Sequence, residues 1–283
     1  QDSEVSGFTA GGEQVDFAVK GRRFGAVRGL WERSERGAYR GFGGMVTGVG
    51  QPGDDGFVAA VDAHLLTEGG VWKIDTQAMH SLAGERHGNG LITDLAYTPR
   101  QGRVHQLALD LLDRDLDIND LGFLRRNDQA QLRYRYTETR SDLEHVRDRQ
   151  TRYRLVYGTN LDGQVTSTGL FAEREWTFHD LSKFRLEAGV RPARWDDRNS
   201  FGNGAFRIED RGTMEFRWAS NDGLELSGGL FGNVYHEDLQ DLSYGGGGFV
   251  AWRPSDRFTA RMVMEFTDRG GWLIHQQDRD FTT

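Results

Sequence analysis

A regular alternation of apolar and charged residues limits most strongly how this chain can fold. In QLRYRYTETR (131–140), Leu132, Tyr134 and Tyr136 alternate with Arg133, Arg135 and Thr137. Because successive side chains of a strand point to opposite faces, one face of this strand is apolar and the other is cationic. The pattern is typical of a half-buried strand in a soluble sheet, and equally of a membrane-barrel strand between lipid and water.

The same alternation recurs along the whole chain and predicts about thirteen strands. Turn sequences such as QPGDDG (51–56) and SNDG (220–223) separate the striped segments and indicate hairpins. The best helical candidate, 110–124, is acidic and short, which favours a loop. The segments expected to be strands are 15–30, 38–49, 57–67, 70–80, 90–98, 103–112, 129–139, 151–158, 165–178, 183–191, 213–219, 222–236, 243–253 and 257–267.

Strand length bears on which solvent the apolar faces contact. A strand that spans a bilayer needs about 9–11 residues, whereas strands of soluble proteins average about 5–6. Several striped segments persist for nine residues or more, among them 129–139, 183–191, 222–236 and 257–267. Strand length therefore favours a membrane barrel over a soluble sheet.

The charged faces are built from arginine, since lysine occurs only at Lys20, Lys73 and Lys183. Arginine binds carboxylates with two parallel hydrogen bonds and tolerates confinement better than lysine. Facing rows of Arg and Glu suit a crowded, water-filled lumen. We therefore expect an all-β, antiparallel, up-and-down transmembrane β-barrel. Its lumen would be lined by Arg133, Arg135, Arg152, Arg154, Arg185, Glu187, Glu215, Arg217, Arg261 and Glu265.

Composition excludes several classes of protein. Charged residues make up 28% of the 283 residues and the mean hydropathy is −0.64. The chain has no apolar run of about 18 residues or more, so spanning helices are excluded. The formal net charge of −8 disfavours nucleic acid as a partner. The absence of cysteine excludes disulfides, cysteine–zinc sites and thiol catalysis.

Four stretches carry a resemblance to a known family: DINDLGFLRRND (117–128), ARWDDRNSFGNGAFRIEDR (193–211), GGMVTGV (43–49) with AAVDAHLL (59–66), and GWLIHQQDRDFTT (271–283). They resemble a family of Gram-negative outer-membrane barrels of unknown function. In full-length members this barrel follows a family-9-like carbohydrate-binding domain. The first two stretches are the most specific, and the similarity runs from Gly21 to Thr283.

The resemblance implies that residues 1–283 are a single outer-membrane β-barrel domain, from which the carbohydrate-binding domain, the signal peptide and the last strands are missing. It implies a location in the outer membrane, with outer-membrane lipid as a partner. The function expected is that of a pore or membrane anchor linked to carbohydrate binding or uptake, with a glycan or oligosaccharide as a further partner. Loops 113–128 and 193–212 are expected to plug the lumen or to contact ligands.

The alternative function is that of a soluble all-β carbohydrate-binding or glycoside hydrolase domain. Its catalytic candidates are Glu173 and Glu175, which lie on one strand face about 6.5–7 Å apart. That separation is near the range used by the two carboxyl groups of glycosidases. In a chain so rich in Arg and Glu, a ladder of charges along the lumen is the more economical interpretation of the pair.

The acidic loops are candidates for ligand or calcium binding. Asp113, Asp115 and Asp117 alternate like the start of an EF-hand, but the required Gly and Glu positions hold Ile118 and Leu124. A calcium site of another kind in this loop is left open, and no other cofactor is expected. The eight histidines show no zinc-binding spacing. In the second loop, Asp196, Asp197 and Arg198 could bind calcium or sugar.

Overall fold

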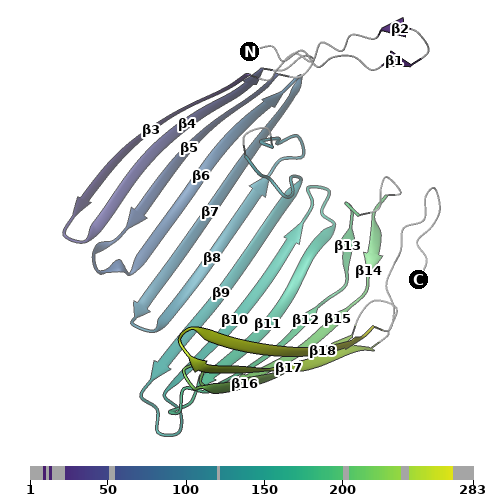
Figure 1. Ribbon diagram of the computed structural model, residues 1–283. Coiled ribbons are helices and arrows are strands. Elements are labelled where there is room, and N and C mark those ends of the chain that lie inside the picture. The colour runs from purple at the N-terminus through teal and green to yellow at the C-terminus, as the bar shows by residue number, and fades with distance from the viewer. Residues whose placement is uncertain are drawn as a thin grey trace. The chain divides into compact units, whose positions relative to one another are not determined.

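The computed structural model describes residues 9–10, 13–14, 23–50, 55–119, 122–199, 204–236 and 242–269. Fourteen of the described strands form one sheet (Figure 1). They are β3 (Arg23–Glu35), β4 (Ala38–Gly50), β5 (Gly56–Leu66), β6 (Trp72–Ala83), β7 (Arg86–Arg100), β8 (Arg103–Leu112), β9 (Gln129–Ser141), β10 (Asp148–Thr159), β11 (Val165–Thr177), β12 (Lys183–Arg191), β15 (Arg211–Ala219), β16 (Leu226–His236), β17 (Leu242–Ser255) and β18 (Phe258–Asp268).

Four short strands lie outside this sheet. β1 (Thr9–Ala10) pairs with β2 (Glu13–Gln14), and β13 (Arg194–Asp196) pairs with β14 (Phe206–Ile208). A single 3-10 turn, η1 (Glu68–Gly70), connects β5 to β6. Among the described residues, no helix is long and apolar enough to cross a bilayer.

The sheet follows the chain from one strand to the next. Its order is β18-β17-β16-β15-β12-β11-β10-β9-β8-β7-β6-β5-β4-β3, so β13 and β14 form an excursion between β12 and β15. The sheet is antiparallel, as in the pairings of β10 with β11 and of β16 with β17. The predicted all-β, antiparallel, up-and-down fold is confirmed. Within the described residues, β3 and β18 stand at the two ends of the order and no pair joins them.

The strands are long. The shortest strands of the sheet, β12 and β15, have 9 residues each, and the longest, β7, has 15. All fourteen therefore reach the length that a tilted strand needs to span a bilayer, about 9–11 residues. All fourteen segments expected from the alternation are found as strands. Part of the first expected segment, 15–22, lies outside the described residues.

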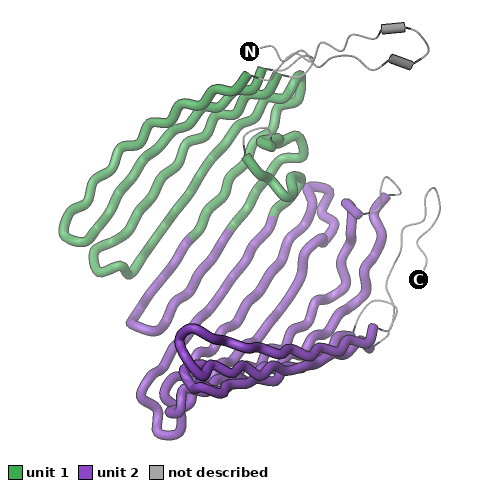
Figure 2. The backbone as a smooth tube through the Cα atoms, in the orientation of Figure 1, with its two compact units in different colours: residues 1–94, 109–130 green, residues 95–108, 131–283 purple. Residues whose placement is uncertain are grey.

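The chain divides into two compact units (Figure 2). Unit 1 comprises residues 1–94 and 109–130, and unit 2 comprises residues 95–108 and 131–283. Strands β7, β8 and β9 each contribute residues to both units.

In unit 1 the two faces of the sheet differ sharply in polarity. Directly paired residues of an antiparallel ladder share a face. One face carries the row Val27, Val46 and Ala59, with Val27 76% exposed. The opposite face carries Arg28 and Asp62. Other exposed residues of the apolar face are Trp31, Phe42, Phe57 and Val61.

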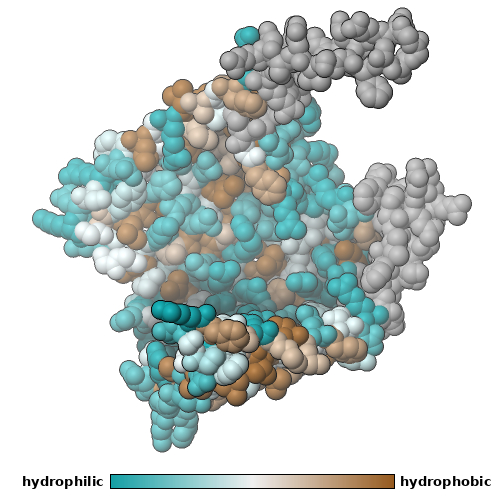
Figure 3. All heavy atoms as spheres, in the orientation of Figure 1, coloured by the Kyte–Doolittle hydropathy of each residue, from teal (hydrophilic) through white to brown (hydrophobic). Residues whose placement is uncertain are grey.

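In unit 2 the same separation holds over six strands. One face carries the aligned row Ala172, Ala188, Met214 and Val234, whereas the other carries Glu173 and its neighbours. Figure 3 shows hydrophobic atoms gathered over β16, β17 and β18 in the lower part of the view. Exposed residues of the apolar face include Leu170, Val190, Phe216, Leu230, Val250, Met262, Met264 and Phe266.

The buried apolar core of unit 1 lies beneath the loop between β8 and β9. Leu116 of this loop is 1% exposed and packs with Ala60, Met79 and Leu112. Gly88 and Gly90 make this contact possible, because a Cβ atom on Gly88 would collide with the backbone of Leu116. The described part of the loop, residues 113–119 and 122–128, therefore lies on the polar face, where it covers part of the sheet.

Candidate functional site

A ladder of arginine and glutamate side chains runs across the polar face of unit 2. Its central member is Glu173 of β11, whose side chain is only 5% exposed. Glu173 accepts hydrogen bonds from Arg152 of β10 at 2.7 Å and from Arg185 of β12 at 2.9 Å. Arg185 also binds Glu187 at 2.7 Å, and Arg154 binds the same carboxylate. Two carboxylates thus hold three guanidinium groups across three strands.

The strand register explains why these side chains meet. Arg152 is directly opposite Glu173, and Glu173 is directly opposite Glu187. Like charges at opposite positions repel each other, and Arg185 offsets this by binding both carboxylates. Charge-assisted pairs of this kind are stronger than hydrogen bonds between neutral groups. The ladder consequently fixes side chains that would otherwise be mobile on a hydrated face.

The ring of Phe171 lies on the polar face beside the ladder. Arg154 lies over its ring at 4.8 Å from the centroid, and Arg191 does so at 5.2 Å. The ring fits because Gly169 and Gly189 flank it, and a Cβ atom on Gly189 would collide with it. Cation–π contacts of this geometry contribute up to about 2 kcal/mol when they are shielded from water.

The ten residues predicted to line a lumen fall into two groups. The structure joins Arg152, Arg154, Arg185 and Glu187 into the ladder through Glu173. It places the others on the same polar face but outside the ladder. Glu215 accepts a 2.8 Å hydrogen bond from the hydroxyl of Tyr235. The remaining members lie along β9, β15 and β18: Arg133, Arg135, Arg217, Arg261 and Glu265.

Two of the predicted lumen residues that lie outside the ladder have their guanidinium groups over aromatic rings. The guanidinium of Arg261 lies 4.1 Å from the ring centroid of Phe249, and that of Arg217 lies 6.0 Å from the centroid of Phe231. For Arg133 and Arg135, alternation with Tyr134 and Tyr136 decides the face. Tyr136 stacks on Tyr153 at 6.1 Å, and Tyr153 alternates with the ladder arginines along β10.

The two glutamates considered for glycoside hydrolysis share a strand face, as the sequence predicts. Both oxygens of Glu173 are occupied, one by Arg152 and the other by Arg185. Glu175 lies directly opposite Arg185 and is half-buried. The surroundings of Glu173 are those of a structural charge ladder, and they offer no free carboxylate oxygen for general acid–base work.

A second polar cluster, in unit 1, escapes the sequence analysis. His64 binds Asp75 through Nδ1 at 2.8 Å and Asp62 through Nε2 at 2.9 Å. Arg28 approaches Asp62 at 3.4 Å, and Lys73 pairs with Asp75 at 2.8 Å. The signal that could have found it is the alternation in AAVDAHLL (59–66), where Asp62 and His64 share a face.

The aspartates of the loop 113–128 diverge. Asp113 accepts bonds from the backbone and side-chain amides of Asn89, and Asp117 accepts from Asn119. Asp115 is exposed. The backbone amide of Asp117 donates to Ser81, which is fully buried. Among the described residues, no group of three or more potential ligands is arranged to hold a metal ion.

In the second loop, Asp196 and Asp197 point to different partners, as expected for adjacent residues. Asp196 accepts from the backbone amides of Arg198 and Asn199 and from the Asn199 side chain. Burial raises the pKa of Asp196, but these hydrogen bonds outweigh burial, so the pKa lies below its usual value. Asp197 receives a 3.3 Å hydrogen bond from Asn160. The contacts of Asp196 stay within the loop, whereas that of Asp197 connects the loop to the β10–β11 turn.

No protein-family model and no curated protein matches the chain.

Proposed function

We propose that this chain forms the wall of an outer-membrane β-barrel whose polar face borders water and whose apolar face contacts lipid. The observation that carries the proposal is the exposure of large apolar side chains on one face of strands that are all 9 residues or longer. In water the exposure of such a face would be unfavourable, and apolar patches larger than a few hundred Å² are rare on soluble monomers. In hydrocarbon it is the face that a barrel presents.

Aromatic residues at the strand ends support the same assignment. On the apolar face, Trp176, Phe184 and Trp218 are paired in one row across β11, β12 and β15. Trp252 and Phe258 pack edge to face near the hairpin between β17 and β18. Aromatic rings collect at both membrane–water interfaces, where an amphipathic side chain suits the head-group level.

The loops support an orientation of the sheet in the membrane. Three of the four two-residue connections between described strands of the sheet, those after β3, β7 and β17, lie at one end of the up-and-down strands, whereas the fourth, residues 84–85, lies at the opposite end. The longest connections, 113–128 and 192–210, lie at the other end. Outer-membrane barrels have short periplasmic turns and longer extracellular loops. We therefore assign the short turns to the periplasmic side.

The charged ladder gives the proposal its mechanism. Seven of the ten residues predicted to line the lumen are arginine and three are glutamate, so a water-filled lumen bordered by these side chains would attract anions. Loop 113–128, packed on the polar face of unit 1, would narrow the passage. The family resemblance suggests carbohydrate-related anionic solutes. The end strands β3 and β18 would need partners in a bilayer, because lipid cannot satisfy an open sheet edge.

Planar-bilayer recording of the full-length protein tests the pore. We expect discrete conductance steps with anion selectivity, and Arg217→Glu should shift the reversal potential towards cations. The control is Arg33→Glu, because Arg33 lies on the apolar face beside the β3–β4 turn. Membrane-inserted protein without conductance would leave an anchor as the function. A freely soluble protein that binds or hydrolyses glycans would replace the proposal by the soluble alternative.

A further inference from the structure

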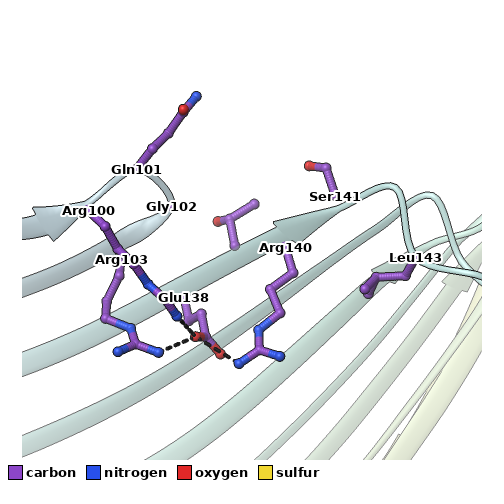
Figure 4. A pocket seen from close by; sticks show the side chains of 9 residues that line it. Arg100, Gln101, Gly102, Arg103, Glu138, Arg140, Ser141 and Leu143 are labelled. Carbon is purple, nitrogen blue, oxygen red and sulfur yellow. Dashed lines mark hydrogen bonds and ion pairs between the residues drawn. The ribbon is translucent and has the colours of Figure 1, made fainter.

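Three arginines converge on one carboxylate beside the turn that joins β7 to β8 (Figure 4). Oε1 of Glu138 receives Arg103 at 2.7 Å, Arg140 at 3.1 Å and Arg100 at 3.5 Å. These four side chains line an open cavity of about 500 Å³ in unit 2. We name these four residues the Glu138 cluster.

The three arginines of the cluster carry more positive charge than Glu138 neutralises. Three guanidinium groups face one carboxylate, which leaves an excess of two positive charges. Each guanidinium offers five N–H donors, and all three arginines bind the same oxygen of Glu138, while Arg103 also interacts with the hydroxyl of Tyr136. Nε of Arg103 is buried, and no described atom accepts its hydrogen. The excess positive charge and the unused N–H donors suit an anionic ligand that is rich in acceptor oxygens.

The position of the cluster on the strands identifies the kind of anion. Along β8, Leu107, Leu109 and Leu111 occupy the apolar face, His105 follows them, and Arg103 ends the series. Along β9 the same face runs from Leu132 through Tyr134 and Tyr136 to Glu138 and Arg140. Two residues of a strand span about 7 Å. The order of aliphatic, aromatic and charged groups matches the order of acyl chain, interface and head group in a lipid leaflet.

The aromatic step of this series is well packed. His105 contacts Tyr136 at 4.9 Å between ring centroids and binds the hydroxyl of Tyr134 at 2.8 Å. Tyr97 lies 5.9 Å from His105. These rings hold the ends of β7, β8 and β9 together directly beneath the arginines. The cluster is thus preorganised at the end of these strands. The aromatic side chains beside it lie on the same face of the sheet as the leucines.

We propose that the Glu138 cluster binds the phosphate group of a phospholipid head group in the periplasmic leaflet. The inference rests on the proposed function, since it needs the apolar face to lie in a bilayer. Arginine pairs with phosphate through parallel hydrogen bonds, and basic pockets at the membrane surface recognise anionic lipids in this way.

Native mass spectrometry of the detergent-solubilised full-length chain tests the site, with phosphatidylglycerol as the probe. Diacylglycerol serves as the phosphate-free lipid and glycerol phosphate as the free phosphate. We expect phosphatidylglycerol to bind with a much higher affinity than either diacylglycerol or glycerol phosphate. The double variant Arg103→Gln, Arg140→Gln should weaken its binding about tenfold or more. Glu138→Gln should tighten it roughly threefold, because it removes the competing negative charge.

Arg33→Gln is the matched control, because Arg33 also lies beside a hairpin turn but pairs with one carboxylate, Glu35, at 2.7 Å. Unchanged lipid binding in the double variant, or weaker binding in Glu138→Gln, would overturn the site. Equal affinity for glycerol phosphate would overturn the lipid as its source. If the double variant does not fold, Arg140→Gln alone provides the test, since this side chain is 48% exposed.

Flotation of the wild-type chain with lipid vesicles separates the two proposals. A chain that does not enter vesicles contradicts the membrane assignment and the lipid site together. A chain that enters vesicles, yet whose phosphatidylglycerol binding is unchanged in the Arg103→Gln, Arg140→Gln variant, contradicts the lipid site alone.

Discussion

Met262→Arg is expected to destabilise the folded protein in lipid by about 2–4 kcal/mol, the cost of placing arginine on the lipid face near the bilayer midplane. Met262 lies near the middle of β18, on the same face as Met264 and Phe266, and is 62% exposed. The measurement is the free energy of unfolding in vesicles, followed by tryptophan fluorescence during denaturant titration.

Val263→Arg is the matched control, since Val263 is adjacent in sequence and equally open at 57% exposure but lies on the polar face. There the new arginine would stand between Arg261 and Glu265, and the expected change is within about 0.5 kcal/mol. In a soluble sheet both side chains face water and both substitutions should be equally mild. Equal effects of the two variants would therefore contradict lipid contact.

Glu173→Gln is expected to lower the free energy of unfolding by about 2 kcal/mol. Removing one partner of a buried ion pair costs about 3–5 kcal/mol, and we reduce this figure because Arg152 and Arg185 are 30% and 42% exposed. The neutral amide leaves two guanidinium groups facing one acceptor oxygen. Denaturant titration in the same lipid checks the value.

Glu175→Gln supplies the control for this prediction, because Glu175 lies two residues away on the same face. We expect a change below about 0.5 kcal/mol, as for other surface substitutions. An equal loss in both variants would show that the ladder has no special role in stability. If the wild-type protein hydrolyses glycans and either variant loses this activity, the glycosidase interpretation would be restored.

The strands could be predicted from sequence because alternation is a local signal. Segments 103–112 and 183–191 coincide with β8 and β12, and β9 is found where QLRYRYTETR lies. The side of the sheet on which each charged residue lies follows from the same period. The identity of the ladder arginines was accessible for this reason, without any knowledge of which strands pair.

Contacts between strands could not be predicted in the same way, because they depend on register. The union of Asp62, His64 and Asp75 requires His64 to lie opposite Asp75, which the turn at 67–71 decides. The three arginines around Glu138 come from three strands, and only their pairing brings them together. Leu116 is an apolar residue in an acidic loop, and its local sequence does not indicate that its side chain is buried.

Collision accessibility of single spin labels in vesicles tests the central claim most directly, and the chain allows it because it contains no cysteine. Labels would replace Val27 and Met262 on the apolar faces, and Ala26 and Val263 on the polar faces, all at exposed positions. We predict that the first two collide with dissolved oxygen and are shielded from a water-soluble nickel chelate, whereas the last two show the reverse. Equal access of the nickel chelate to all four positions would contradict the account.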